Sequence, residues 1–137
     1  MPSPRPDGYL AAVSGEDSLY ERLGGEIAIM AAVDLFYGKV FADPITRPFF
    51  DGIDMDVQAR KQVAFMTYAF GGPVAQRGRD LRAAHAHLVR DRGLGDVHFD
   101  AVANHLQATL TELGIDAELQ AEVMAIIGAT RTEVLDR

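Results

Sequence analysis

From residue 17 onward, apolar residues recur at helical spacing, and glycines or a proline punctuate the runs. Apolar side chains three and four residues apart share one face of an α-helix. The pattern predicts helices over residues 18–23, 26–41, 54–70, 81–91, 96–114 and from 116 onward, with a short helix that ends at 49–50. No stretch shows sustained strand alternation, so we expect an all-α fold, either a plain bundle or a globin-like arrangement.

Individual residues indicate where these helices begin, end and face the core. In the pair Gly24-Gly25, at least one residue is expected to adopt a left-handed backbone conformation. Aspartates that can cap a helix precede three of the helices: Asp54 or Asp56, Asp96 and Asp116. The apolar side of the 26–41 helix is expected to carry six residues: Ile27, Met30, Ala31, Phe36, Tyr37 and Val40.

Length and composition are those of one ordinary globular domain, with 137 residues, 48% hydrophobic and 24% charged. We expect a domain over residues 17–137 and a flexible extension over 1–16, which holds three of the six prolines. No apolar run has the length of a signal peptide or a membrane span, so a cytoplasmic protein without membrane insertion is expected. A net charge of −7 argues against nucleic acid as a partner.

Some classes of chemistry are excluded by residue content. The absence of cysteine excludes disulfides, thiolate ligation of iron, iron–sulfur clusters and the haem-attachment motif C-x-x-C-H. The few serines follow no nucleophile-elbow pattern, the glycines form no phosphate-binding loop, and no acidic or histidine spacing matches a zinc or di-iron site.

The predicted helix over residues 54–70 has an unusual inward face. At about 100° per residue, Gln58, Lys61, Gln62 and Phe65 lie on one side. Two glutamines in line with an aromatic residue indicate either a buried face that meets a group requiring hydrogen bonds or the solvent edge of an amphipathic helix. Tyr37 poses a similar choice, because an inward hydroxyl needs either a bound ligand or a backbone carbonyl.

Four histidines are present, and two of them share a short predicted helix. His85 and His87 are two residues apart, so they point to opposite sides and do not chelate one metal ion. His85 shares an apolar stripe with leucines and alanine, as either a metal ligand or a satisfied core residue, whereas His87 faces solvent. His98 and His105 are expected at the surface or rim of their helix.

Several stretches, taken together, resemble the group I truncated haemoglobins, whose helices form a two-over-two sandwich. The resemblance covers about residues 18–135 and rests on order and spacing. The matching segments are Ser18-Leu-Tyr-Glu-Arg-Leu-Gly-Gly25, Asp34-Leu-Phe-Tyr37, Phe49-Phe50, Gln58 to Gln62, Thr67-Tyr-Ala-Phe-Gly-Gly72, Arg82-Ala-Ala-His-Ala-His-Leu-Val89 and His98-Phe-Asp-Ala-Val102.

The resemblance implies one non-covalent b-type haem and a role for each matching residue. His85 would be the proximal iron ligand, with its other ring nitrogen oriented by a backbone carbonyl. Phe50 would pack on the porphyrin. The remaining roles are distal hydrogen bonding by Tyr37, Gln58 and Gln62, and lining of the pocket and of any gas channel by Phe65 and Met66.

Lys61 departs from those members of the family that carry histidine at this position. A lysine there either pairs with a haem propionate or loses its proton and coordinates the iron. The segment Gly128 to Arg137 contains no histidine, so the covalent haem link that some relatives make there is not expected.

The function implied by the resemblance is reversible binding of dioxygen, nitric oxide and carbon monoxide at ferrous iron. Oxidation of nitric oxide to nitrate would make the protein an enzyme, supported by an unidentified reductase. The alternatives are gas binding or sensing without turnover, a redox haem protein ligated through Lys61, and a haem-free helical interaction module.

Overall fold

The computed structural model describes residues 18–72 and 81–137, and these residues form seven α-helices and one 3₁₀ helix. The elements are α2 (Leu19–Leu23), α3 (Gly25–Ala42), η1 (Arg47–Phe50), α4 (Met55–Ala69), α5 (Leu81–Arg92), α6 (Asp96–Glu112), α7 (Ala117–Gly128) and α8 (Arg131–Val134). The predicted N-terminal extension and the predicted irregular loop at Gly78 and Arg79 lie outside the described residues.

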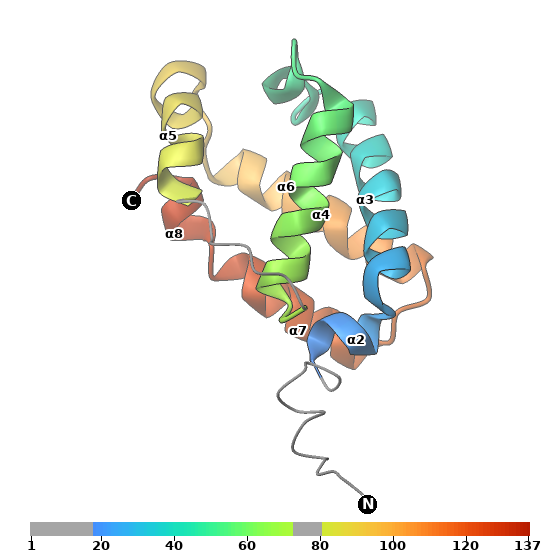
Figure 1. Cartoon of the computed structure of the whole chain (residues 1–137). Helices are drawn as coiled ribbons and strands as arrows, with labels where there is room; N and C mark the ends of the chain where they lie inside the picture. The colour runs from blue at the N-terminus through green and yellow to red at the C-terminus, as the bar shows by residue number, and fades with distance from the viewer. Residues whose placement is uncertain (1–17, 73–80) are drawn as a thin grey trace, which may run out of the picture.

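The long helices form two crossed pairs. Helix α3 packs against α4, helix α6 packs against α7, and the first pair crosses the second through the contact between α3 and α6 (Figure 1). The short α2 joins the layers by contacting both α3 and α7, and α5 lies beside α8. This confirms the predicted all-α, two-over-two arrangement. None of the described helices combines the length and apolar character needed to span a bilayer.

Polar caps and glycines set most of the helix ends. The Asp54 carboxylate accepts hydrogen bonds from the first backbone N–H groups of α4, and the Asp116 carboxylate caps α7 in the same way. Gly24 ends α2 at φ 118°, in the left-handed region predicted for the glycine pair. Asp96 is not a cap: Gly95 precedes α6, and its N–H donates to His98 Nδ1 at 2.9 Å.

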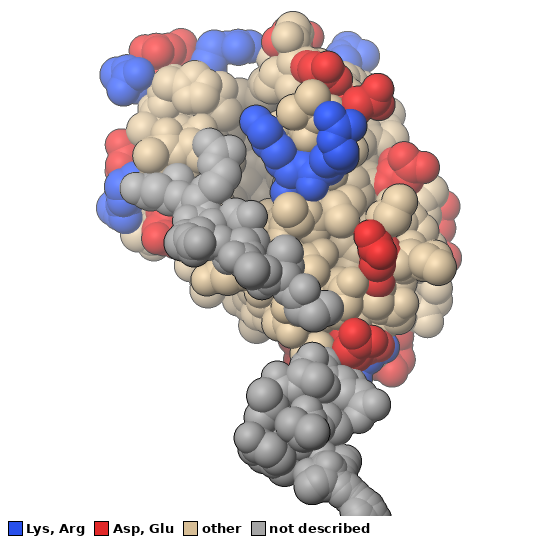
Figure 2. All heavy atoms as spheres, viewed as in Figure 1, with Lys and Arg blue, Asp and Glu red and all other residues tan. Residues whose placement is uncertain are grey.

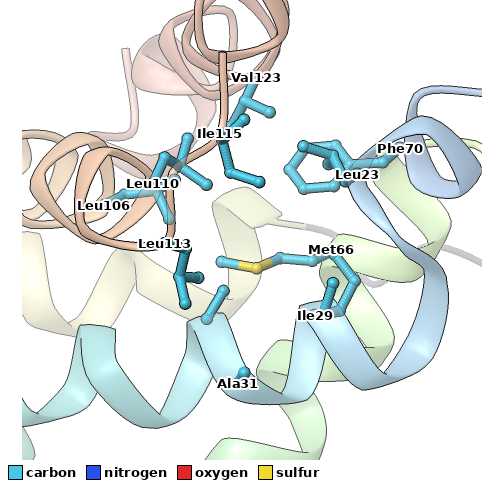
Figure 3. Close-up of a pocket in the computed structure, with 12 residues that line it drawn as sticks. Leu23, Ile29, Ala31, Met66, Phe70, Leu106, Leu110, Leu113, Ile115 and Val123 are labelled. Carbon is cyan, nitrogen blue, oxygen red and sulfur yellow. The ribbon is translucent and has the colours of Figure 1, made fainter.

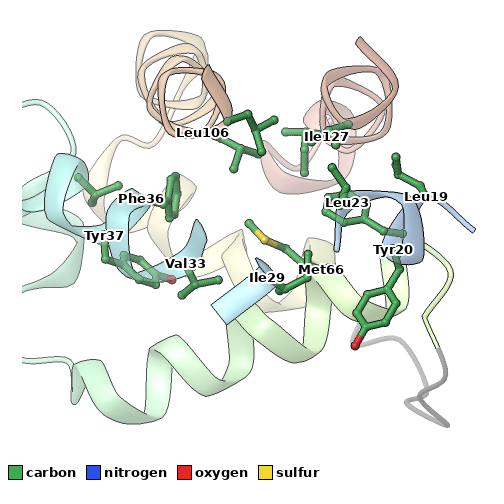
Figure 4. Packing of buried hydrophobic residues seen from close by; sticks show 14 of the residues in the cluster. Leu19, Tyr20, Leu23, Ile29, Val33, Phe36, Tyr37, Met66, Leu106 and Ile127 are labelled. Carbon is green, nitrogen blue, oxygen red and sulfur yellow. The ribbon is translucent and has the colours of Figure 1, made fainter. Parts of the chain in front are cut away.

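The core lies between the two layers (Figure 4). Helix α3 contributes Ile29, Val33, Phe36 and Val40, which are spaced at three and four residues. Ile27 and Met30 do not belong to this face: their exposed fractions are 82% and 54%, and Ala31 is exposed as well. The predicted face is thus confirmed for Phe36, Tyr37 and Val40, which are buried, and wrong for the other three residues. The error arises because α3 is apolar on nearly every side, so apolar spacing alone does not determine which face is buried.

The C-terminal region also differs from the prediction of one continuous helix. Helix α7 ends at Gly128, and the separate turn α8 begins at Arg131. The Thr130 hydroxyl donates to the Ile127 carbonyl at 2.6 Å within the connection. The break turns the chain so that α8 packs against α5.

Candidate functional site

The imidazole of His85 is held in one tautomer by its own helix. Its Nδ1 lies 2.9 Å from the carbonyl oxygen of Leu81, one turn earlier in α5. Because a carbonyl only accepts, Nδ1 carries the hydrogen and Nε2 keeps its lone pair. Nε2 forms no hydrogen bond with any described residue. This is the arrangement in which a neutral histidine ligates a metal, and the backbone carbonyl is the orienting group that we predicted.

A second polar group combines Tyr37 of α3 with Gln58 of α4. Gln58 Nε2 donates to the Tyr37 hydroxyl oxygen at 3.3 Å. Only 8% of Tyr37 is exposed, and burial raises the pKa of its phenol, an effect that the hydrogen bond from Gln58 partly offsets. The phenol therefore stays protonated at neutral pH, and its O–H donates to no described residue. A buried, unused donor is suited to a polar ligand.

The other residues of the predicted α4 face are less engaged. Gln62 is half-buried and makes no hydrogen bond with a described residue. Lys61 is exposed and has neither a hydrogen bond nor an ion pair within the described ranges. Phe65 is half-buried and packs against the core.

Phe50 is fixed beside Tyr37 by aromatic contacts. The two ring centroids are 5.7 Å apart in an edge-on geometry, and Phe41 lies 6.0 Å from Phe50 on another side. Phe50 sits at the end of η1, whose Pro48 occupies a first-turn position that favours proline. The sequence therefore places an aromatic ring and a tyrosine hydroxyl next to each other from separate elements.

Met66 points away from these polar groups, into an apolar cavity between the two layers. The cavity measures about 160 Å³, and the Met66 side chain, 1% exposed, reaches into its middle (Figure 3). Its walls come from α2, α3, α4, α6, α7 and the turn before α7, and include Leu23, Ile29, Phe70, Leu110, Ile115 and Val123. An apolar lining and a volume of this size suit small apolar molecules.

The molecular surface is hollowed between α4 and α5 (Figure 2). These two helices bury little of their own surface: among their residues only Met66 is fully buried, and α5 has no buried residue at all. Basic side chains gather over α4 next to the hollow, and the basic residues of α4 are Arg60 and Lys61. A flat apolar group with an acidic edge, inserted here, would cover the half-buried faces of both helices.

The donor set fits haem and not a bare metal ion. No group of three or more His, Asp or Glu side chains that could hold a metal ion occurs in the described part of the chain. A single imidazole suits a metal that brings its other in-plane ligands with it, as haem iron does. The half-buried Leu81 and Leu88 of α5 suit the apolar faces of a porphyrin.

Residues that the sequence prediction did not identify hold α5 in place. Arg82 Nη1 donates to Asp136 and to the Arg137 carbonyl, and Arg92 donates to the Pro48 carbonyl at 2.7 Å. These partners are 44 to 55 residues away in the sequence, and an isolated arginine on a helix gives no signal of such contacts.

The other histidines are structural. His98 accepts a hydrogen bond from Gly95 and packs edge-on against Phe49, with centroids 4.8 Å apart. His105 Nε2 lies 2.7 Å from an Asp43 carboxylate oxygen and joins α6 to the end of α3. Both are half-buried, which agrees with the predicted location at the surface or rim of the helix, and His87 is exposed as predicted.

Known proteins similar to this chain are globins. The profile of the family described as bacterial-like globin matches residues 18–136. A group 1 truncated haemoglobin of Chlamydomonas moewusii is 50% identical over 119 residues, covering 87% of this chain and 68% of that protein. The group 1 truncated haemoglobin GlbN of a Synechocystis strain is 50% identical over 112 residues, covering 82% of this chain and 90% of GlbN.

Solved structures agree with these sequence relatives. The 2/2 haemoglobin of a Synechococcus strain, described as cyanomet with covalently attached haem, superposes with a TM-score of 0.85 at 51% identity, covering 88% of this chain and 99% of that one. The truncated haemoglobin of Tetrahymena pyriformis in the Fe(III) form gives 0.78 at 42% identity, with coverages of 86% and 97%. The chain therefore belongs to the bacterial-like globin family, as a group I truncated haemoglobin that binds haem and diatomic gases.

Proposed function

We propose that one b-type haem binds non-covalently between α4 and α5, with His85 Nε2 as the proximal iron ligand. The observation that carries the proposal is a pair of groups on α3 and α5 that have no hydrogen-bond partner among the described residues: Nε2 of His85 and the O–H of Tyr37. Non-covalent attachment is supported by the lack of cysteine in the chain and of histidine in α7 and α8.

Haem bound in this way would bind dioxygen, nitric oxide or carbon monoxide at ferrous iron and support oxidation of nitric oxide to nitrate. The protein's own contribution is a hydrogen-bonding wall. The O–H of Tyr37, which has no partner among the described residues, would donate to the ligand, while the Gln58 amide donates to the hydroxyl oxygen at 3.3 Å. Gln62, one turn further along α4, adds an amide with no described partner. Donors in a dry site favour ligands that carry negative charge.

A relative supports this assignment of the polar residues. Variants of the Tetrahymena pyriformis truncated haemoglobin at one tyrosine and two glutamines have been crystallised. Those three positions are separated by 21 and 4 residues, as Tyr37, Gln58 and Gln62 are in this chain. Equal spacing supports the same location on the corresponding helices.

Phe50 would lie against the porphyrin, where its contacts with Phe41 and Tyr37 prevent the ring from rotating away. Phe65 would contribute a second apolar surface from α4. Met66 and the 160 Å³ apolar cavity between the two layers offer a place for a second small gas, which the reaction of nitric oxide with dioxygen requires. Haem would supply the one electron needed to form nitrate from nitric oxide and dioxygen, so continued turnover would require a reductase that returns this electron.

Lys61 could either pair with a haem propionate or coordinate the iron, and we propose that it pairs with a propionate. Its exposed position and the basic surface beside the hollow suit a carboxylate at the edge of haem. A second candidate function, electron transfer by six-coordinate haem, is favoured by the fact that the Lys61 ammonium has no described partner and can turn inward. Gas sensing without turnover uses the same site and differs only in lacking reductant-supported consumption of nitric oxide.

Substitution of the two neighbouring histidines tests the proximal assignment. We expect His85→Ala to abolish stoichiometric haem binding in a titration followed by visible absorption. His87→Ala is the matched control, because His87 lies two residues away on the same helix and is exposed. Full haem affinity in His85→Ala, or equal loss in the two variants, would refute the assignment. Reductant-supported turnover of nitric oxide then separates the enzyme from the sensor.

A further inference from the structure

The placement of α5 depends on its ends, because the helix itself is weakly packed. It contains no fully buried residue, and its main packing partner is the four-residue helix α8. A helix held by so little apolar contact is free to shift unless polar contacts fix it. In a protein whose iron ligand lies on this helix, such a shift changes the direction from which the imidazole approaches the iron.

Arg82 provides the contact at the start of α5. Its Nη1 donates to an Asp136 carboxylate oxygen at 3.2 Å and to the Arg137 carbonyl oxygen at 2.9 Å. Asp136 has φ 58°, and it is the only non-glycine residue among those described with a positive φ. This left-handed turn directs the Asp136 carboxylate and the next carbonyl to the same guanidinium nitrogen.

The segment that Arg82 contacts is itself attached to the rigid part of the fold. Arg131 of α8 donates to Asp96 at 3.0 Å and to Asp100 at 2.7 Å, both in the first turns of α6. The Arg131 guanidinium also stacks 4.5 Å above the ring of Phe99, a core residue. Arg137 donates to Asp96 as well. The contact of Arg82 therefore ties α5 to the core through α8.

The residue next to Arg82 orients the proposed iron ligand. The carbonyl of Leu81 accepts the Nδ1 hydrogen of His85, and Leu81 is bonded directly to Arg82 in the first turn of the helix. We propose that Arg82, held by Asp136 and the Arg137 carbonyl, is a positioning residue that fixes the direction of His85 Nε2 toward the haem iron. This inference rests on the proposed haem site.

The test compares Arg82→Gln and Asp136→Asn with Arg90→Gln as the matched control. Arg90 lies on the same helix, but its only described ion pair is with the adjacent Asp91, so its loss leaves α5 attached. We use the haem-loaded protein in a Lys61→Ala background, which keeps the sixth iron position open. The readouts are the iron–imidazole stretching band of the reduced protein and the rate of haem transfer to an excess of apomyoglobin.

We expect Arg82→Gln and Asp136→Asn to lower the stretching frequency and to speed haem loss about 2- to 5-fold, as loss of one exposed ion pair predicts. Arg82→Lys keeps a charged donor and should restore the band. Arg90→Gln should match the parent. If Arg82→Gln and Arg90→Gln give the same band and rate while His85→Ala loses haem, the positioning role is refuted and the proposed haem site stands.

A variant without a tethered imidazole separates positioning from general stability. In His85→Gly supplied with free imidazole, the ligand is no longer attached to α5. There, Arg82→Gln should leave the stretching band unchanged. An equal shift in the tethered and untethered proteins would overturn the proposal, because the effect would then not pass through the backbone of α5. Full haem retention by His85→Gly without imidazole would instead refute the proximal assignment itself.

Discussion

Replacing Tyr37 by phenylalanine removes one hydroxyl and leaves the aromatic contacts with Phe36 and Phe50 in place. In the native protein this hydroxyl accepts from Gln58, and its own O–H donates to no residue of the described ranges. The substitution therefore removes a donor to the ligand and, at the same time, releases the amide of Gln58. Because the released amide can turn toward the ligand, the single substitution should destabilise the bound ligand by less than Tyr37 and Gln58 together stabilise it.

The size of the effect follows from the value of one hydrogen bond. A net contribution of about 0.5–1.5 kcal/mol corresponds to dissociation of dioxygen that is about 2- to 13-fold faster in Tyr37→Phe. Removing both groups in Tyr37→Phe/Gln58→Ala should destabilise the dioxygen complex by about 1–3 kcal/mol, so that dioxygen dissociates about 5- to 150-fold faster. The two substitutions should be non-additive, because the side chains of Tyr37 and Gln58 contact one another at 3.3 Å.

The assay is stopped-flow displacement of dioxygen by carbon monoxide from the reduced, haem-loaded protein. Carbon monoxide dissociation, displaced by nitric oxide, is the control, since this ligand develops much less negative charge and needs the donor less. An unchanged rate for dioxygen in Tyr37→Phe, or equal acceleration for both gases, would show that the Tyr37 O–H does not reach the ligand.

Three further predictions concern other parts of the structure. If Lys61 pairs with a propionate, the dithionite-reduced parent should give a five-coordinate spectrum, and Lys61→Ala should leave that spectrum unchanged but speed haem loss. If the parent instead gives split six-coordinate bands that Lys61→Ala converts to a five-coordinate spectrum, Lys61 is a ligand of the iron. The pKa of the Asp43 carboxyl is lowered by the hydrogen bond from the Ile45 N–H and by His105. The ionised carboxylate therefore stabilises the fold above the ordinary pKa of aspartate, and this stabilisation is lost as the pH falls through the lowered pKa. The free energy of unfolding should consequently fall less steeply with decreasing pH in Asp43→Asn than in the parent. Gly24→Ala should lower the free energy of unfolding by about 1–2 kcal/mol in urea denaturation, because φ there is 118° and the new Cβ would lie 2.9 Å from Ala28 Cβ.

The elements of the fold could be predicted from the sequence where a local signal specifies them. Gly24, Asp54 and Asp116 mark helix ends through backbone conformation and capping, which involve residues within one turn, and the structure confirms all three. Asp96 shows the limit of that logic. A glycine with its N–H held by His98 takes the capping position instead, and no rule about side-chain oxygens identifies it.

The orientation of α3 could not be predicted because its composition is ambiguous. Ile27 and Met30 are as apolar as Ile29 and Val33, yet the first two are exposed and the last two are buried. The charged Glu26 and Asp34 lie on the exposed side with Ile27 and Met30, and these two carboxylates were the available signal. The choice between faces is made by α4 and α6, which pack on α3 from outside its own sequence.

The role of each histidine could not be predicted from its spacing in the sequence, but it can be inferred from its hydrogen bonds in the structure. Apolar periodicity separates His85 from His87, but it does not distinguish a ligand from a satisfied core residue. Hydrogen bonding does: His98 accepts at Nδ1, which leaves its hydrogen on Nε2, and His105 directs Nε2 at Asp43. In His85 the backbone takes the Nδ1 hydrogen and Nε2 keeps a lone pair with no described partner. The bonding pattern therefore separates this half-buried imidazole from the other two, because only its Nε2 lone pair is both unprotonated and without a described partner, as a metal ligand requires.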